Sequence, residues 1–331
     1  MGATPARPRG LTLVLRSDED LLEAAVARAA EVSSIPVEHV EKDFWLTECL
    51  RGLAEYADAE GLTVMLKGGT SLSKAYRLIS RFSEDADMLV VFGELTKSRR
   101  DDHLKGLVAA AEARTGLAAI SDAAQSDTGV TRVVTLKYPT PTGSTTVAPR
   151  VKIELHTAGG PFPHGRQVLR SLLSEHWHSI DNAGPADEYE ELAGSSIEVL
   201  EPCRTLVEKL VLLHEAHTRA GGSAAARKIV TVRHYYDVWC LLGDEAVLAA
   251  VDTHGITALA HDVYTYSSAA GYEAASRPPG GFATSPAFGE EPTNAVRSAY
   301  AKAISDLVWP GAASPSLENC IRRVQELAAR L

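Results

Sequence analysis

The stretch from Leu66 to Val90 constrains the fold of this chain more than any other part of its sequence. It reads LKGGTSLSKAYRLISRFSEDADMLV: a short apolar strand, a double glycine, a hydroxyl pair, a helix, and a second strand that opens with two acids. Residues two apart in a strand point to the same side. Asp85 and Asp87 can therefore direct two carboxylates at one point, which predicts a polar site where this strand begins.

Two convergent carboxylates suit Mg²⁺, which typically takes one or two protein carboxylates together with substrate phosphates. Gly68 and Gly69 allow backbone N–H groups to approach a phosphate. Thr70 and Ser71 begin a helix predicted to run to about Ile79, and a helix N-terminus favours anions. An acidic pair by itself is also typical of a solvated strand end. The prediction of a metal and phosphate site therefore depends on the glycines and hydroxyls that precede the pair.

A third carboxylate, Glu154, lies on a later predicted strand. Residues 150–156 alternate between apolar and polar side chains, and Glu154 has an apolar neighbour on either side. A third acid on an adjacent strand is what a two-metal phosphoryl-transfer site requires. We therefore expect Asp85, Asp87 and Glu154 to meet.

Hydrophobic periodicity predicts the α+β class. A helical segment spans residues 1–60, a mixed α/β core spans 61–160, and a mainly helical domain spans 161–331. No strand is predicted after Gly159–Pro161, and residues 268–292, rich in Gly, Pro and Ser, are predicted to form a surface loop. The expected strands are 64–66, 86–92, 130–138 and 150–156, and the expected helices are 18–33, 37–56, 96–115, 205–219, 229–243, 294–309 and 315–330.

The acidic composition narrows the classes of function. The 331 residues include 33 basic and 43 acidic side chains, a formal charge of −10, which argues against a general nucleic-acid coat protein but leaves room for a local basic groove. No apolar run approaches a membrane span, and residues 1–10 lack the apolar segment of a secretory signal. The four cysteines are far apart, which is typical of reduced thiols in a cytoplasmic protein.

Several motifs together resemble a known family. The segment KGGTSLSKAYRLISRFSEDADM is similar to the nucleotidyltransferase motif of AbiEii/AbiGii-type abortive-infection toxins, a branch of the DNA polymerase β-like superfamily. Further resemblances follow in family order between about residues 38 and 240. They are EKDFW at 41–45, RTLVEK at 204–209 with the preceding Glu201-Pro202 and the later Leu213-His214, and RHYYD at 233–237.

The resemblance implies a nucleotidyltransferase-fold mixed sheet core and an enzyme that uses an NTP and one or two Mg²⁺ ions. In it, Asp85, Asp87 and Glu154 would bind metal, and Glu154 would also help to activate the acceptor hydroxyl. Lys209 would contact the triphosphate, and Asp237 would orient the base, the sugar or Lys209. The implied nucleotide-binding residues are Lys67, Gly68, Gly69, Thr70, Ser71, Lys209 and Asp237. Related branches carry RDxxD where this chain has RHYYD, so His234 replaces their first acid.

The resemblance also implies partners. It suggests an RNA acceptor, with tRNA as the candidate, and a cognate antitoxin that is often a winged-helix regulator, in a toxin–antitoxin or phage-defence system. Two alternatives stay open: a nucleotidyltransferase that modifies a protein or small-molecule hydroxyl, and an inactive nucleotide-binding regulator of the same fold. Basic residues are expected to gather at one positive cleft: Lys67, Lys74, Arg77, Arg81, Lys209, Arg227, Lys228 and Arg233.

Three other features of the sequence are better explained by a structural role than by catalysis or ligand binding. His214 and His217 share a helix face, but the spacing is one residue short of the H-E-x-x-H zinc signature, so a packed or hydrogen-bonded His214 is favoured. Tyr236, in an apolar helix, is favoured as a core residue over a base-stacking one. Lys42 and Asp43 are expected to form an ion pair between a helix and the core.

Overall fold

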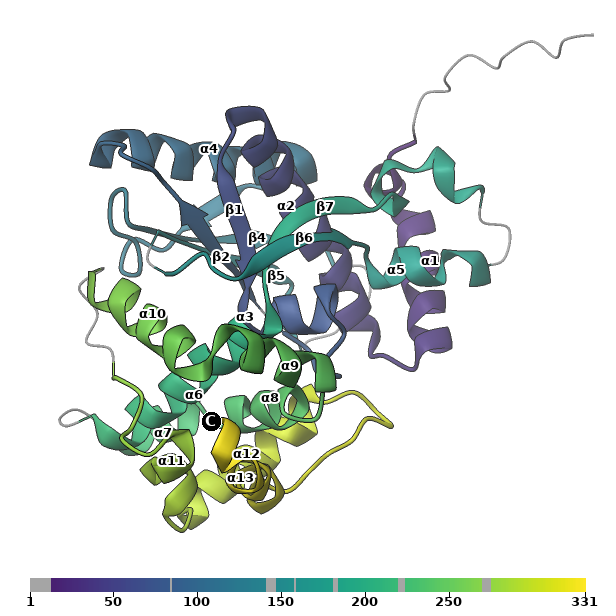
Figure 1. Ribbon diagram of the computed structural model, residues 1–331. Helices are drawn as coiled ribbons and strands as arrows, with labels where there is room; N and C mark the ends of the chain where they lie inside the picture. The colour runs from purple at the N-terminus through teal and green to yellow at the C-terminus, as the bar shows by residue number, and fades with distance from the viewer. Residues whose placement is uncertain are drawn as a thin grey trace, which may run out of the picture.

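The computed structural model describes residues 13–83, 85–140, 147–157, 159–180, 184–219, 224–269 and 275–331. Within these residues, seven strands form one mixed sheet, which confirms the α+β class (Figure 1). The segment 1–10, which by sequence lacks the apolar run of a secretory signal, lies outside the described residues. No helix in the described ranges is both long and apolar enough to cross a bilayer.

The strand order across the sheet is β3-β4-β5-β2-β1-β7-β6. β1 pairs antiparallel with β2 and parallel with β7, and β2 pairs parallel with β5. The remaining neighbours are antiparallel. The strands are β1 (Thr63–Lys67), β2 (Asp85–Val91), β3 (Ala119–Ser121), β4 (Thr131–Lys137), β5 (Arg150–His156), β6 (His164–Leu169) and β7 (Ser195–Leu200).

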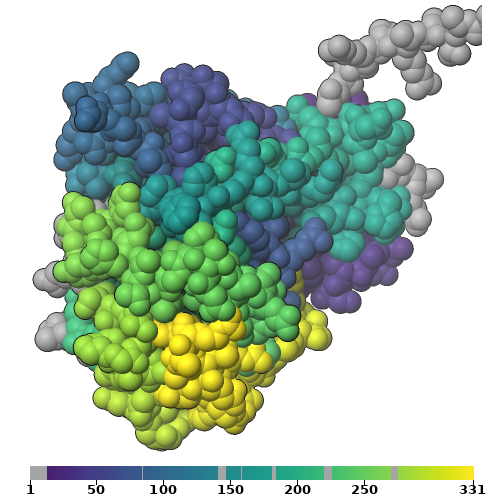
Figure 2. Space-filling view, in the orientation of Figure 1, coloured from purple at the N-terminus to yellow at the C-terminus, as the bar shows by residue number. Residues whose placement is uncertain are grey.

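Helices from the first part of the chain cover one face of the sheet and share its larger core. They are α1 (Glu19–Ser33), α2 (Val37–Glu60), α4 (Lys97–Thr115) and the short α5 (Leu172–His176). The C-terminal helices build a second core and form the green-to-yellow side of the molecule (Figure 2). They are α6 (Pro202–Thr218), α7 (Ala224–Val230), α8 (Arg233–Leu241), α9 (Glu245–His254), α10 (Ile256–Ala269), α11 (Pro286–Gly289), α12 (Asn294–Leu307) and α13 (Leu317–Glu326).

Side-chain alternation gives the sheet two different faces. Leu66, Met88 and Ile153 point into the larger core beneath α2 and α4. The opposite face buries less apolar surface among the described residues, namely a small cluster of Met65, Leu89 and Leu200, and Val133 beside Glu154. Polar residues on that face therefore stay available to a ligand, because no helix of the larger core covers them.

The predicted helices and strands up to residue 156 are confirmed, with one correction. The helix after the double glycine does not begin at Thr70. A short α3 (Gly68–Thr70) starts at Gly68 and continues as a π-helical turn over Ser71–Ala75, well before Ile79. The double glycine is thus part of the helix, and π-helical turns are often found at functional sites.

Two predictions for the second half of the chain are wrong. β6 and β7 follow Pro161, where no strand is predicted, and β6 escapes detection because it is an edge strand with only Leu169 fully buried. The segment 268–292 is not simply a surface loop, since Phe282 and Phe288 within it are buried in the second core. The division of the chain into 1–60, 61–160 and 161–331 stays a prediction. β6 and β7 follow residue 160 but belong to the same sheet as the strands before it.

Gly52 lets α2 and α4 approach closely, and this contact tests the packing of the fold. A Cβ at Gly52 would lie 2.7 Å from the Ala110 carbonyl oxygen and 3.0 Å from the Arg114 Cβ. We expect Gly52→Ala to lower the free energy of unfolding by up to about 2 kcal/mol. Overpacking of about 1–3 kcal/mol exceeds the helix-propensity gain of about 1 kcal/mol.

Urea denaturation measures this effect. Gly289→Ala is the matched control, because a Cβ at that helical glycine meets nothing within 4 Å. The control is expected to leave stability unchanged or slightly raised. Equal stability of the two variants would contradict the close contact.

Candidate active site

Three polar side chains lie side by side on the open face of the sheet. The register pairs Lys67 of β1 with Asp87 of β2, and Asp87 with Glu154 of β5. All three belong to the set that alternates away from the larger core. The strand pairing alone therefore brings a cation and two carboxylates into one row, as expected from the alternation of β2 and β5.

This row forms one wall of a cavity of about 180 Å³, and α6 and α8 form the facing wall. Figure 1 shows α3 between the sheet and the C-terminal helices, next to this junction. The lining residues are Lys67, Gly68, Gly69, Arg81, Ser83, Asp85, Asp87, Glu154, Thr205, Glu208, Lys209, Leu212, Arg233 and His234. We call this cavity the acidic cleft.

The double glycine is required by its neighbours in the acidic cleft. Gly68 has a φ of 72°, which disfavours other residues, and a Cβ there would lie 2.5 Å from the Asp87 Oδ2 atom. A Cβ at Gly69 would lie 2.8 Å from both the Arg81 Nη2 and Ser83 Oγ atoms. The glycines thus bring the backbone up to the carboxylate side of the cleft.

The hydroxyl pair supports this loop from within. The Thr70 hydroxyl donates to the Asp85 carbonyl oxygen at 2.5 Å, and Ser71 donates to the Gly68 carbonyl oxygen at 2.9 Å. Both residues are buried. Thr70 therefore ties the glycine loop to the start of β2, while neither hydroxyl is among the residues that line the acidic cleft.

Asp87, Glu154 and His156 form a cluster of possible metal ligands, with donor atoms within 4.8 Å of one another. The Lys152 Nζ atom lies 2.5 Å from the Glu154 Oε1 atom, and the His156 Nε2 atom lies 3.3 Å from Oε2. These contacts, with His156 the larger influence, lower the pKa of Glu154 to about 2. Glu154 is therefore ionised at neutral pH.

Behind the acidic cleft, three buried charged side chains meet. The Asp237 carboxylate accepts from the Arg81 Nε atom at 2.6 Å and from Nη2 at 2.8 Å, and the Lys209 Nζ atom lies 2.7 Å from Oδ2. Burial alone would raise the pKa of Asp237, but Arg81 and Lys209 hold it well below its ordinary value. Asp237 has no exposed surface. We call these residues the buried triad.

His234 connects the buried triad with the acidic cleft. Its Nδ1 atom lies 3.4 Å from the Lys209 Nζ atom and 3.7 Å from the Asp237 Oδ2 atom. Burial and the charge of Lys209 lower the pKa of His234 to about 4, so the imidazole is neutral at neutral pH. His234, which stands where related branches have the first acid of RDxxD, thus lines the cleft as a neutral imidazole.

The structure brings most of the sequence-predicted site residues together. Lys67, Gly68, Gly69, Asp85, Asp87, Glu154 and Lys209 line the acidic cleft, whereas Thr70, Ser71 and Asp237 lie behind its wall. Sequence reasoning missed His156 as a possible ligand, although the polar alternation of β5 points to it. It also missed Thr205, whose buried hydroxyl faces the cleft and finds no hydrogen-bond partner among the described residues.

Several expectations for charged residues need correction. Asp43 forms its ion pair between the helix and the rest of the fold with Lys74, with the Lys74 Nζ atom 2.6 Å from the Asp43 Oδ1 atom, so Lys74 is engaged there. Arg77 pairs with Glu175, and Arg81 belongs to the buried triad. Lys74 and Arg77 are absent from the cleft lining. His214, as favoured above, is hydrogen-bonded, with Nδ1 2.8 Å from the Ser285 hydroxyl.

Comparison with known proteins bears on this site. A family model described as the nucleotidyl transferase AbiEii toxin of type IV toxin–antitoxin systems matches residues 49–322. Among solved structures, MenT4, a nucleotidyltransferase toxin from Mycobacterium tuberculosis H37Rv, superposes with a TM-score of 0.51 and 15% sequence identity. The match covers 93% of this chain and 88% of MenT4, and it shows a shared fold. No curated protein sequence matches.

The buried triad yields a stability prediction. Asp237→Asn removes the charge that compensates Arg81 and Lys209 but keeps the side-chain size. We expect the free energy of unfolding to fall by about 3–5 kcal/mol, because two buried cations lose their counter-ion. Asp306→Asn, which breaks an exposed pair with Lys302, should leave the free energy of unfolding essentially unchanged, because solvent screens that pair. A comparable loss in both variants in urea denaturation would contradict the role of the triad.

The same carboxylate makes stability depend on pH. Because the pKa of Asp237 is lower in the folded protein than its ordinary value of 3.8, its stabilisation is present above about pH 4. It is lost as the pH falls further, when the unfolded chain binds the proton first. We expect the wild-type free energy of unfolding to drop below about pH 4. The drop should be smaller in Asp237→Asn, and parallel acid profiles would contradict the depressed pKa.

Proposed function

The chain belongs to the AbiEii family of nucleotidyltransferase toxins of type IV toxin–antitoxin systems, and from this we propose its substrates and metal. The enzyme transfers a nucleoside monophosphate from an NTP to an RNA acceptor, with tRNA as the candidate, and releases pyrophosphate in a Mg²⁺-dependent reaction. The observation that carries the proposal is the row Lys67–Asp87–Glu154, which faces Lys209 across the acidic cleft.

The donor set of the acidic cleft suits a divalent cation. Asp87, Glu154 and His156 present donor atoms within 4.8 Å of one another, and Asp85 lines the same cavity. Carboxylate oxygens are the ligands that Mg²⁺ prefers. Asp85, Asp87 and Glu154 would hold one or two ions, which when bound neutralise phosphate charge and orient the reacting oxygens.

Charge balance in the cleft supports an NTP as the substrate. The acids Asp85, Asp87, Glu154 and Glu208 are matched in number by the bases Lys67, Arg81, Lys209 and Arg233. With the acids engaged by divalent cations, Lys67, Arg233 and the net positive charge of the buried triad are left to attract a triphosphate. The segment Lys67 to Ser71 is proposed to bind the triphosphate, because Gly68 and Gly69 allow backbone N–H groups to approach the phosphate oxygens.

Two side chains on α6 complete the phosphate side of the cleft. Lys209 presents its ammonium group at the cleft wall, where it would contact the triphosphate and stabilise the charge of the departing pyrophosphate. The Thr205 hydroxyl, one helical turn earlier, is a donor without an assigned acceptor in the described part of the chain. A phosphate or sugar oxygen would satisfy it.

Asp237 is proposed as a positioning residue. Its carboxylate has no exposed surface, so contact with a base or sugar is disfavoured. The ion pair with Lys209 at 2.7 Å and the paired hydrogen bonds from Arg81 instead hold the Lys209 ammonium in place. Orientation of Lys209 is therefore the role that the geometry supports among the three considered for Asp237.

The biological setting completes the proposal. Family membership implies an antitoxin partner, and we propose that this is a separate winged-helix regulator and that the pair acts in phage defence. The reaction takes place in the cytoplasm, where NTPs and tRNA are available. The four cysteines are free thiols, which is compatible with that compartment.

Labelled NTPs test the activity directly. Purified protein is incubated with each labelled NTP, Mg²⁺ and, separately, total RNA, lysate protein or small metabolites. We expect label on RNA in the tRNA size range. Label on protein or on a small molecule would overturn the RNA acceptor, and absence of label from all three would support the inactive regulator.

Asp87→Asn supplies the matched variant. We expect the transfer rate to fall by at least about 100-fold, because a preorganised charged group is lost at the reacting centre. Its melting temperature should stay close to that of the wild type. Asp306→Asn, on the exposed face of α12, should keep full activity. Toxicity of Asp87→Asn equal to that of the wild type in growing cells would contradict the proposed chemistry.

A further inference from the structure

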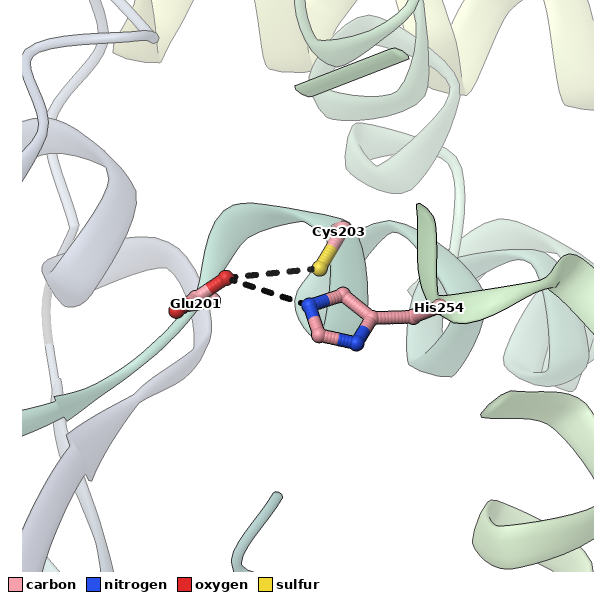
Figure 3. Close-up of side chains that lie close together, drawn as sticks. All are labelled: Glu201, Cys203 and His254. Atoms are coloured by element: carbon pink, nitrogen blue, oxygen red, sulfur yellow. Dashed lines mark hydrogen bonds and ion pairs between the residues drawn. The ribbon is translucent and has the colours of Figure 1, made fainter. Parts of the chain in front are cut away.

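A second group of metal-binding side chain types lies outside the acidic cleft. Glu201 directly precedes α6, Cys203 lies in the first turn of α6, and His254 is the last residue of α9. Figure 3 shows the three side chains converging, with dashed contacts from the Glu201 carboxylate to the Cys203 thiol and to the His254 imidazole. The fold thus brings a carboxylate, a thiol and a histidine ring together from segments about fifty residues apart in sequence.

The separations are close to those that one cation requires. The Glu201 Oε2 atom lies 3.8 Å from the Cys203 Sγ atom and 3.9 Å from the His254 Nε2 atom. All three donor atoms lie within 4.8 Å of one another. In a tetrahedral zinc site the corresponding oxygen–sulfur and oxygen–nitrogen distances are about 3.6 Å and about 3.4 Å. For these two pairs, shifts of a few tenths of an ångström would therefore complete the geometry.

We propose that Glu201, Cys203 and His254 bind a divalent cation of the zinc class, with water at the fourth coordination position. Mixed sulfur, nitrogen and oxygen donors favour such a borderline-soft cation over Mg²⁺. Coordination replaces the thiol proton of Cys203, which leaves to solvent. This inference concerns a site apart from the acidic cleft and does not rest on the proposed function.

The surroundings hold the ligands in position and leave a route for the cation. The Phe162 ring contacts the His254 ring edge-on, with centroids 5.2 Å apart, and the Glu201 N–H donates to the Pro163 carbonyl oxygen at 3.0 Å. The Cys203 thiol belongs to a buried residue, while the side chains of Glu201 and His254 are 37% and 25% exposed. The cation would enter from the side of these two residues.

A bound cation would link two helices of the C-terminal part of the chain. It would join the start of α6 to the end of α9, and α6 carries Thr205 and Lys209 toward the acidic cleft. The cation would act on structure, since no residue of the group lines the acidic cleft. Glu201 at the N-terminus of α6 and His254 at the C-terminus of α9 also interact favourably with the helix dipoles without a metal. The experiment must therefore distinguish metal binding from this purely electrostatic placement.

Co²⁺ alone is the probe, because thiolate coordination to Co²⁺ produces a sulfur-to-metal charge-transfer band in the near ultraviolet. Full-length protein, freed of metal with a chelator, is titrated with Co²⁺ and then with Zn²⁺. We expect the band to grow to one equivalent and to disappear as Zn²⁺ displaces Co²⁺. The cluster of Asp87, Glu154 and His156 contains no sulfur and cannot produce this band.

Variants assign the band to the proposed ligands. Cys203→Ser should abolish it, and His254→Gln should weaken Co²⁺ binding by more than about 100-fold, since loss even of a residue that only hydrogen-bonds a metal ligand costs about 10–100-fold. Cys240→Ser is the matched control and should keep the band, because the Cys240 thiol is free and lies outside the group. Near-ultraviolet circular dichroism confirms that each variant is folded, and His254→Gln, at a partly exposed position, provides the test if Cys203→Ser does not fold.

The Co²⁺ charge-transfer band in each variant decides whether the metal site exists. A band in the wild type and Cys240→Ser that is lost in Cys203→Ser and weakened in His254→Gln establishes the site. No band at saturating Co²⁺, or a band that persists in Cys203→Ser, overturns it. Neither result depends on whether the protein transfers nucleotides, so failure of this inference and failure of the proposed function can be told apart.

Discussion

The ion pairs of Asp237 join the two cores of the molecule at the place where the cleft forms. Arg81 precedes β2 on the sheet side, Lys209 comes from α6, and both reach a carboxylate on α8 that has no exposed surface. The Arg81 segment is also bound to the end of α12, where the Phe82 N–H donates to the Leu307 carbonyl oxygen at 2.8 Å. The position of α6 relative to β2 therefore depends on this buried charge.

Such a charge cluster is an inefficient source of stability. Desolvation of three charged groups offsets much of their attraction, and apolar residues of similar volume are often at least as stabilising. What the cluster provides is placement, because the forked guanidinium of Arg81 fixes the carboxylate, and the carboxylate fixes Lys209. Phosphoryl transfer depends on charged groups that are already in position, so a fixed Lys209 ammonium group would stabilise the reacting phosphates.

The site was predictable where its residues follow a local pattern. Alternation along β2 and β5 correctly placed Asp87 and Glu154 on one face, because a strand with one buried face repeats every two residues. The contact between Arg81 and Asp237 spans 156 residues and leaves no local trace. The sequence therefore places Arg81 among the basic residues of a cleft, which it does line, but does not predict its pairing with Asp237. β6 was missed because an edge strand with one fully buried residue has no apolar pattern to detect.

The order of the cleft residues along the chain determines when the site can exist during synthesis. The glycine loop and the first acids are made early, Glu154 follows, and Lys209 and Asp237 come last. β2 is central in the sheet and pairs with β5, so the acidic row is incomplete until residue 156 has emerged from the ribosome. A nascent chain shorter than about two thirds of the protein lacks side chains of α6 and α8 that line the cleft. A cell that makes this toxin is therefore exposed to its chemistry only after α6 and α8 have been translated and folded against the sheet.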